Sequence, residues 1–414
     1  MCIRDSIRTI ERLSPERPLA VEFYRASSSE PLSTVNLKLI HLDESIELSR
    51  RVPILENMGF RVIDEQTYET VPAGKTNHIY IHNMTLEVES GEPIDLERLG
   101  NLAAACFLAV WFGDAENDGY NGLVVNAGLD WRDVAFLRTI SRFLWQAGSS
   151  YSQDYMWETL NRHAPIAAML VALFYARFEP ERADEAAASE IATQIEAKLE
   201  SVDSLDEDRI VRRFANVLSA IMRTNFFRHG ADGLPCREIS LKLDSKAIDA
   251  LPEPRPFREI FVHSRRVDGI HLRFGSVARG GIRWSDRPQD FRTEILGLAK
   301  AQQVKNAVIV PFGAKGGFVA KQLPAGGGRE EMLAEGMAAY RIFISNLLDI
   351  TDNLDGEEIV PPEDVVRHDG DDPYLVVAAD KGTATFSDLA NEISAEHDFW
   401  LGDAFASGGS AGYD

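Results

Sequence analysis

The hydrophobic pattern of this 414-residue chain changes character twice, which limits the chain to a mixed fold with three parts. Residues 7–94 combine strand-like alternation with one short amphipathic stretch. Residues 95–232 read almost wholly as helix, and Ile210–Ile221 has its apolar residues at helical spacing along one face. Residues 233–414 alternate short strands with helices, a pattern typical of an α/β domain. We therefore expect an α+β module, a helical region and an α/β domain, in that order.

The first part carries two strand signals with a helix between them. Val35, Leu37 and Leu39 alternate with other residues, and Ile79–Leu86 indicates a second ribbon. Glu47–Met58 predicts an amphipathic helix that is ended by the glycine after it. This order favours a small α+β sandwich of the regulatory ACT type. A structural module without a ligand is the alternative.

The third part opens with short strands at Ile239–Leu243, Glu259–Val262 and Gly269–Phe274. Glu331–Ile350 predicts a helix with an apolar face. Tyr374–Ala379 is continuously apolar, so it predicts a strand that is buried on both faces.

Composition excludes several classes of protein. The net charge of −22 at pH 7 repels phosphate backbones, so nucleic-acid binding is not expected. Only three cysteines occur (Cys2, Cys106 and Cys236), too few for a disulfide framework, which fits a reducing compartment. The longest apolar stretches are shorter than the ~18–20 residues of a membrane helix; they are Leu102–Phe112 and Pro165–Ala176. We expect a cytoplasmic protein that does not enter a membrane.

Both ends of the chain look abrupt. Met1–Ser6 has no secretory signal behind it, and it back-translates to a transposon end used to prepare sequencing libraries. We therefore expect residues 1–6 to be an adapter artefact; a genuine short arm is the alternative. The other end, Gly408–Asp414, is a glycine-rich turn that leads into nothing. We expect an internal fragment of a longer protein.

Residue types suited to chemistry gather between Arg279 and Asp380. Arg279 precedes two glycines, which allow a ligand to approach the backbone closely. Lys305 and Lys315 flank an apolar run at residues 307–310, and Lys315 lies in a glycine-rich turn. Three converging cations would suit a small di-acid, with one cation for each carboxylate and another group for chemistry. The alternative is that the lysines are separate and exposed.

Longer strings in this part of the chain carry a resemblance to a known family. They are Arg-Gly-Gly-Ile-Arg-Trp-Ser-Asp-Arg from Arg279, Gln-Gln-Val-Lys-Asn-Ala-Val from Gln302, and Gly-Ala-Lys-Gly-Gly-Phe from Gly313. Two further strings are Ala-Asp-Lys-Gly-Thr-Ala-Thr-Phe-Ser-Asp from Ala379 and Phe-Ala-Ser-Gly-Gly-Ser-Ala-Gly-Tyr-Asp from Phe405. These strings resemble the large bacterial NAD-specific glutamate dehydrogenases, and weaker similarity extends over nearly the whole chain.

The resemblance implies a role for each matching residue. Lys315 matches the family's catalytic lysine. Asp380 matches the aspartate that handles protons, and Asp364 is the competing assignment. Gln302 and Lys305 match the pair that binds the substrate's α-carboxylate.

The implied reaction is NAD-dependent oxidation of L-glutamate to 2-oxoglutarate and ammonia. Arg279 stands where the smaller enzymes of this kind have a lysine for the side-chain carboxylate, and arginine keeps that charge. A lysine partly buried among other cations can act as a base near neutral pH, and an adjacent aspartate can accept the amine proton. A dehydrogenase for another amino acid is the alternative. Arg279 argues against it, because an apolar substrate side chain would leave that cation unpaired.

NAD is the implied cofactor, and no metal is expected. The family's dinucleotide-binding domain follows the substrate domain, and the chain ends before any strand–Gly-x-Gly-x-x-Gly–helix unit. The expected fold is therefore an ACT-like module, a helical region and a substrate domain of glutamate dehydrogenase type, with the Rossmann domain absent and the NAD contacts unassigned. One cluster resembles a ligand set but is interpreted as a solvated polar turn: His368, Asp369, Asp371 and Asp372.

A last hypothesis is a non-catalytic regulatory fragment in which residues 18–230 bind an effector. The intact Lys305, Lys315 and Asp380 argue against it. The partners that follow from the resemblance are L-glutamate, 2-oxoglutarate and a small-molecule effector. We also expect the full-length form to be a homo-oligomer.

Overall fold

The structure is a computed structural model that describes residues 3–27, 29–74, 76–230, 232–305 and 312–409. The chain forms two compact units. The first consists of residues 1–136 and 157–168, and the second of residues 137–156 and 169–414. Within the described ranges, every helix is too short or too polar to cross a membrane.

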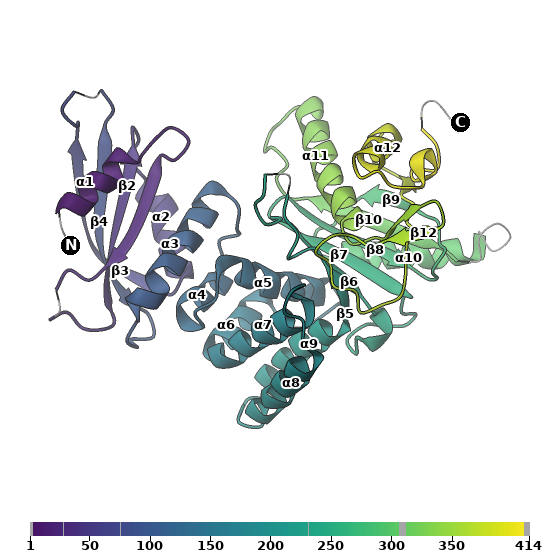
Figure 1. Cartoon of the computed structure of the whole chain (residues 1–414), viewed down its shortest axis with the longest axis horizontal. Coiled ribbons are helices and arrows are strands. Elements are labelled where there is room, and N and C mark those ends of the chain that lie inside the picture. The colour runs from purple at the N-terminus through teal and green to yellow at the C-terminus, as the bar shows by residue number, and fades with distance from the viewer. Residues whose placement is uncertain (1–2, 28, 75, 231, 306–311, 410–414) are drawn as a thin grey trace. The chain divides into compact units, whose positions relative to one another are not determined.

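An antiparallel sheet of four strands forms the centre of the first unit (Figure 1). Its strand order is β1-β2-β4-β3, with β1 (Leu19–Tyr24), β2 (Thr34–Leu42), β3 (Phe60–Thr70) and β4 (Ile79–Val88). Val35, Leu37 and Leu39 of β2 are buried, as the alternation predicted, and so are Met84 and Leu86 of β4. Ile81 of β4 is half-buried. Three helices accompany the sheet, namely α1 (Ile3–Glu11), α2 (Leu48–Asn57) and α3 (Leu96–Phe112).

The ends of α2 confirm the predicted helix. Glu47 is its N-cap residue and Met58 its C-cap residue. Gly59 follows with a φ of 85°, a left-handed conformation that glycine adopts without strain. The alternating strands and the helix together form the α+β module expected for this part of the chain.

Helices dominate the middle of the chain. They are α4 (Gly122–Asn126), α5 (Trp131–Gln146), α6 (Gln153–Arg162), α7 (Ala164–Phe178), α8 (Glu185–Leu199) and α9 (Leu205–Ala220). The apolar stripe of α9 is buried, as predicted. The expectation that residues 95–232 are almost wholly helical is wrong at its C-terminal end, because residues 221–224 form strand β5 (Ile221–Thr224). Ile221 continues the helical spacing of the apolar residues before it, but its backbone pairs with Leu243 in the next strand, and this pairing determines its conformation.

A seven-stranded mixed sheet forms the centre of the second unit, in the order β13-β9-β10-β8-β7-β6-β5. The other strands are β6 (Ile239–Leu243), β7 (Arg258–His263), β8 (Val267–Arg273), β9 (Gly281–Trp284), β10 (Ala314–Ala320) and β13 (Ala378–Ala379). Strands β13, β9 and β10 are parallel, and the remaining pairs are antiparallel. A separate hairpin consists of β11 (Asn353–Asp355) and β12 (Glu358–Val360).

Two helices, α10 (Phe291–Lys305) and α11 (Arg329–Leu348), pack on opposite faces of this sheet (Figure 1). Successive residues of β10 point to opposite faces. The Gly317 position meets Ile295 of α10, while the ring of Phe318 stacks on Phe343 of α11 with centroids 6.1 Å apart. Helix α12 (Ser387–Glu396) packs beside α11.

The predicted strand at Tyr374–Ala379 is reduced to Ala378 and Ala379. Residues 375–377 are buried but lie outside the ladder. Other contacts fix this segment instead: Arg273 donates to the carbonyl of Tyr374 at 2.9 Å, and Val377 N–H donates to Phe405 O at 2.9 Å. Burial therefore explains the apolar run better than strand pairing does.

Candidate functional site

Two glycines draw three strands together around the candidate site. A Cβ on Gly280 would lie 1.6 Å from the carbonyl oxygen of Ala314, at the start of β10. A Cβ on Gly281 would lie 2.8 Å from the carbonyl oxygen of Ala379, in β13. Neighbouring backbone occupies the space of a Cβ at both positions, so close packing of the strands requires glycine there.

Lys315 lies in strand β10 and not in a turn, which corrects the sequence prediction. Gly316 and Gly317 follow it in the strand. A Cβ on Gly316 would meet Ile282 at 2.4 Å, and one on Gly317 would meet Ile295 at 2.3 Å. These glycines are required by close packing on both faces of the sheet. In sequence the same pair resembles a turn.

An ion pair joins Lys315 to Asp380, which follows β13. Lys315 Nζ lies 2.6 Å from Asp380 Oδ2, and the lysine side chain is only 5% exposed against 23% for the aspartate. Burial raises the pKa of Asp380, but the hydrogen bonds from Lys315, from the Lys381 backbone and from Arg283 outweigh it, so the pKa is lowered overall. Asp380 is therefore held as a carboxylate beside a buried ammonium group.

The turn that carries Asp380 is attached to β9 by one buried side chain. Thr383 Oγ1 accepts a hydrogen bond from Asp380 N at 3.1 Å. The same hydroxyl donates to the carbonyl of Ile282 in β9 at 2.6 Å. This arrangement fixes the Asp380 backbone relative to β9, the strand that carries Arg283.

Asp364, the competing assignment, lies elsewhere in the second unit. It is exposed and has a φ of 54° in the turn after Pro362. Because Asp380 makes the ion pair with Lys315, the geometry favours Asp380 as the partner of the lysine.

Arg279 lies just before β9, beside a cavity in the second unit. Its Nη2 donates to Ser407 Oγ at 2.9 Å, and Ser407 lines a cavity of about 700 Å³. The other walls come from β13, from the turn after it and from the start of α12. Arg279 is thus close to a space that a small di-acid could occupy.

The two residues assigned to the α-carboxylate, Gln302 and Lys305, lie at the C-terminal end of helix α10. Their side chains lie outside the described residues, as does the apolar run at 307–310.

Arg283 and Glu294 are site residues that the sequence analysis missed. Arg283 Nε contacts Asp380 Oδ2 at 3.2 Å, and Arg283 Nη1 contacts Glu294 Oε1 of α10 at 2.9 Å. Arg283 lies two positions after Gly281 on the same strand, so it faces the same side of the sheet. That spacing, in Arg-Gly-Gly-Ile-Arg, is the signal that could have identified it.

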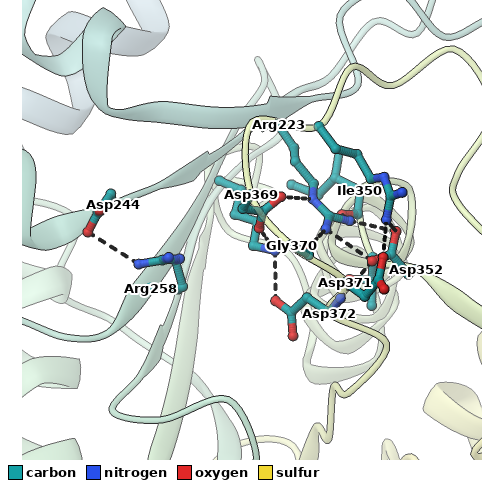
Figure 2. A network of polar contacts seen from close by, with 12 residues as sticks. Arg223, Asp244, Arg258, Ile350, Asp352, Asp369, Gly370, Asp371 and Asp372 are labelled. Atoms are coloured by element: carbon teal, nitrogen blue, oxygen red, sulfur yellow. Dashed lines mark hydrogen bonds and ion pairs between the residues drawn. The ribbon is translucent and has the colours of Figure 1, made fainter. Parts of the chain in front are cut away.

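A network of buried ion pairs lies beside the site and corrects another prediction (Figure 2). Arg223 of β5 contacts both oxygens of Asp352, at 2.8 and 3.0 Å, and Asp369 at 2.5 Å. Lys242 of β6 contacts Asp369 at 2.5 Å and Asp372 at 2.7 Å. The side chains of these two aspartates are 6% and 13% exposed, so they do not form a solvated turn.

The network ties the segment before β13 to the sheet. Arg273 of β8 contacts Asp372 and donates to the carbonyl of Tyr374. Burial raises the pKa of Asp372, but the hydrogen bond from Arg273 and the charges of Arg273 and Lys242 lower it well below its usual value. Because Asp380 follows this segment closely, the buried charges fix the approach to the catalytic candidate.

The described ranges hold no group of three or more histidine, cysteine, aspartate or glutamate side chains arranged to bind a metal ion. What they do hold is a lysine–aspartate pair, a second cation and a nearby cavity. Such an arrangement can move a proton between the ammonium group of Lys315 and the carboxylate of Asp380. Arg279, beside the cavity, can bind an anion.

Comparison with protein families agrees with this architecture. Residues 194–414, slightly more than half of the chain, match the bacterial NAD-glutamate dehydrogenase catalytic domain. Residues 115–180 match the glutamate dehydrogenase helical motif 3, and residues 18–99 match the glutamate dehydrogenase ACT3 domain. The chain therefore belongs to the bacterial NAD-glutamate dehydrogenase family.

Three relatives, each called NAD-specific glutamate dehydrogenase, are similar over most of the chain. The protein of Halomonas elongata is 51% identical over 99% of this chain, and that of Pseudomonas aeruginosa is 52% identical over 97%. The protein of Mycobacterium tuberculosis is 49% identical over 89%. The chain spans about a quarter of the length of these relatives, at 25%, 25% and 24%.

Proposed function

We propose that this chain is the substrate-binding part of an NAD-dependent glutamate dehydrogenase, which converts L-glutamate to 2-oxoglutarate and ammonia. The observation that carries the proposal is the buried Lys315–Asp380 ion pair at 2.6 Å, in a chain about half identical to three enzymes of that name.

Cations bind the two carboxylates of the substrate in this proposal. Arg279 pairs with the side-chain carboxylate, supported by its position beside the cavity that Ser407 lines. Gln302 and Lys305 bind the α-carboxylate, which follows from their match to the family strings. Charge-assisted hydrogen bonds of this kind select a di-acid over an aliphatic amino acid.

Lys315 and Asp380 carry the proton transfers. Asp380 accepts a proton from the substrate's ammonium group, so that the amine nitrogen can form the imine. Lys315 acts as the base in its neutral form: its ammonium group first releases a proton to solvent, and the neutral amine then takes a proton from the attacking water. In its protonated form it stabilises the developing carbinolamine oxygen. The ion pair allows a proton to pass between the two groups without leaving the site.

NAD supplies the acceptor for the hydride from the substrate's Cα. The described residues contain no glycine-rich strand–turn–helix unit that would hold a dinucleotide. We therefore assign none of them to NAD and attribute to this chain only substrate binding and proton transfer.

A dehydrogenase for another amino acid is the second candidate, and Arg279 speaks against it for the reason given from the sequence. The first unit, with its match to the ACT3 domain, supports a regulatory role with a small-molecule effector. Homo-oligomerisation and a cytoplasmic location belong to the same proposal.

The test uses a hybrid enzyme, defined as the full-length Pseudomonas aeruginosa relative in which residues 18–414 of this chain replace the matching segment. We expect glutamate-dependent formation of NADH. In parallel, calorimetry on the 414-residue chain should detect binding of 2-oxoglutarate, and Arg279→Leu should weaken it. A folded hybrid without turnover, together with a chain that does not bind 2-oxoglutarate, would contradict the proposal.

A further inference from the structure

We propose that Arg283 is a positioning residue which, together with Glu294, orients Asp380 so that Oδ2 faces Lys315 and Oδ1 faces the substrate amine. This inference rests on the proposed glutamate dehydrogenase function. It adds two residues that the family strings did not assign to any role.

The two cations beside Asp380 contact the same oxygen atom. Lys315 Nζ lies 2.6 Å from Oδ2, and Arg283 Nε lies 3.2 Å from Oδ2. Contacts from two different strands, β10 and β9, fix the rotation of the carboxylate about its Cβ–Cγ bond. Both of these contacts are to Oδ2, so we assign Oδ1 as the atom that accepts a proton from a substrate.

Glu294 holds the guanidinium group in place from the opposite side. It accepts from Arg283 Nη1 at 2.9 Å through Oε1, and from Ser285 Oγ at 2.7 Å through Oε2. The side chains of Arg283 and Glu294 are 20% and 15% exposed, so water competes with these bonds only weakly. The planar arginine can donate to two carboxylates in different directions, which a lysine ammonium on a flexible stem does less rigidly.

The arrangement also balances charge. Lys315 and Arg283 are two cations, and Asp380 and Glu294 are two carboxylates. Lys315 and Arg283 contact Asp380 from β10 and β9. Glu294 of α10 contacts Arg283, and Lys381 follows Asp380 in its own turn. Because α10 also carries Gln302 and Lys305, the Arg283–Glu294 pair connects the helix assigned to the α-carboxylate with the group assigned to the amine.

The chain offers a matched control. Arg287 pairs with Asp290 in the same short segment, but these side chains are 51% and 46% exposed. Arg287→Gln therefore removes the same charge a few residues away without touching Asp380.

The first measurement follows the Asp380 carboxyl carbon by ¹³C NMR during a pH titration of the 414-residue chain, with Asp380→Asn to assign the signal. We expect the wild-type carboxyl to titrate below an ordinary aspartate, Arg283→Gln to move its midpoint upward, and Arg287→Gln to leave it unchanged. Arg283→Lys, which keeps the charge, should give an intermediate midpoint and serves if the glutamine variant does not fold. An Asp380 midpoint that is the same in all folded Arg283 variants would overturn the proposal.

The second measurement uses the hybrid enzyme. Arg283→Gln should lower kcat by about tenfold to a hundredfold, the value of a lost charge-assisted hydrogen bond, and should move the acidic limb of the kcat/KM–pH profile upward. A role confined to stability would lower the melting temperature and leave that limb in place. Because the NMR titration needs no turnover, a shifted Asp380 midpoint in a folded but inactive hybrid would count against the proposed function alone.

Discussion

Lys315 Nζ lies 2.6 Å from Asp380 Oδ2, although the two residues come from different strands of the seven-stranded sheet. Strand β9 lies between β10 and β13, and its glycines let the three backbones approach closely. The short distance between Lys315 and Asp380 therefore depends on the close packing of the strands at these glycines. The first prediction tests that packing.

Gly280→Ala should disrupt the second unit, because the new Cβ would lie 1.6 Å from the carbonyl oxygen of Ala314. Gly297→Ala is the matched control: Gly297 lies in α10 with no neighbouring atom within 4 Å of the added Cβ. Alanine there should stabilise the helix by roughly 0.5–1 kcal/mol. Urea unfolding of both variants distinguishes the cases, and equal stability of the two would show that the strands can separate without cost.

Asp352→Ala should lower the free energy of unfolding by about 3–5 kcal/mol, since it leaves the buried guanidinium of Arg223 without its bidentate partner. Asp371 provides the control, because its side chain is 59% exposed and it pairs with the part-exposed Arg367. Asp371→Ala should cost at most about 1 kcal/mol. Similar losses for both variants would mean that the network contributes no more than surface ion pairs.

Asp372 should make the chain lose stability in acid. Its pKa is lowered in the folded state, so below the ordinary value of 3.8 the unfolded chain binds a proton that the folded chain does not. The contribution is therefore present above pH 3.8 and is lost as the pH falls toward the folded pKa. Denaturant unfolding between pH 5 and 2 should show a steeper decline for the wild type than for Asp372→Asn, and parallel curves would refute this origin.

Arg279→Leu in the hybrid enzyme should raise KM for glutamate by roughly one to two decades, because a charge-assisted bond is worth ~1.5–3 kcal/mol. The bond is made in the ground state and the transition state alike, so kcat should change less. The ratio of kcat/KM for glutamate to that for norvaline is the measurement. An unchanged ratio would remove Arg279 from the substrate site.

Local pattern was enough to predict several elements. Helix α2 and its terminal Gly59 followed from amphipathic spacing, and β2 and β4 followed from alternation. These elements form through contacts of residues close in sequence or through burial of one face, which a period of 3.6 or 2 records directly.

The buried network could not be predicted in the same way. In the sequence, Asp369 and Asp372 resemble a solvated turn. In the structure they pair with Lys242, which lies on a strand far away in the sequence. The usable signal was on the other side of the pairs: Lys242 is a lone cation inside the apolar strand Ile239–Leu243. A buried lysine requires a partner, but the sequence does not say which carboxylate supplies it.

Glycine misled the sequence analysis at Gly316 and Gly317, where the pattern predicted a turn. Glycine is common in turns because it tolerates positive φ, yet here it is needed because Ile282 and Ile295 fill the space of a Cβ. The resemblance to the family strings proposed Lys315 and Asp380 for one site, whereas their spacing alone did not. Arg283 escaped notice because its role depends on a helix residue, Glu294, that no short string includes.

The central claim is that Lys315 performs proton transfer rather than substrate binding. In the hybrid enzyme, Lys315→Ala should lower kcat by about 10²–10⁴-fold, the usual contribution of a general acid or base. Calorimetry on the same variant should still detect 2-oxoglutarate, because Arg279 and Lys305 remain. Lys300→Ala, which alters an exposed lysine of α10, should leave both quantities unchanged. Near wild-type kcat in a folded Lys315→Ala hybrid would contradict the account.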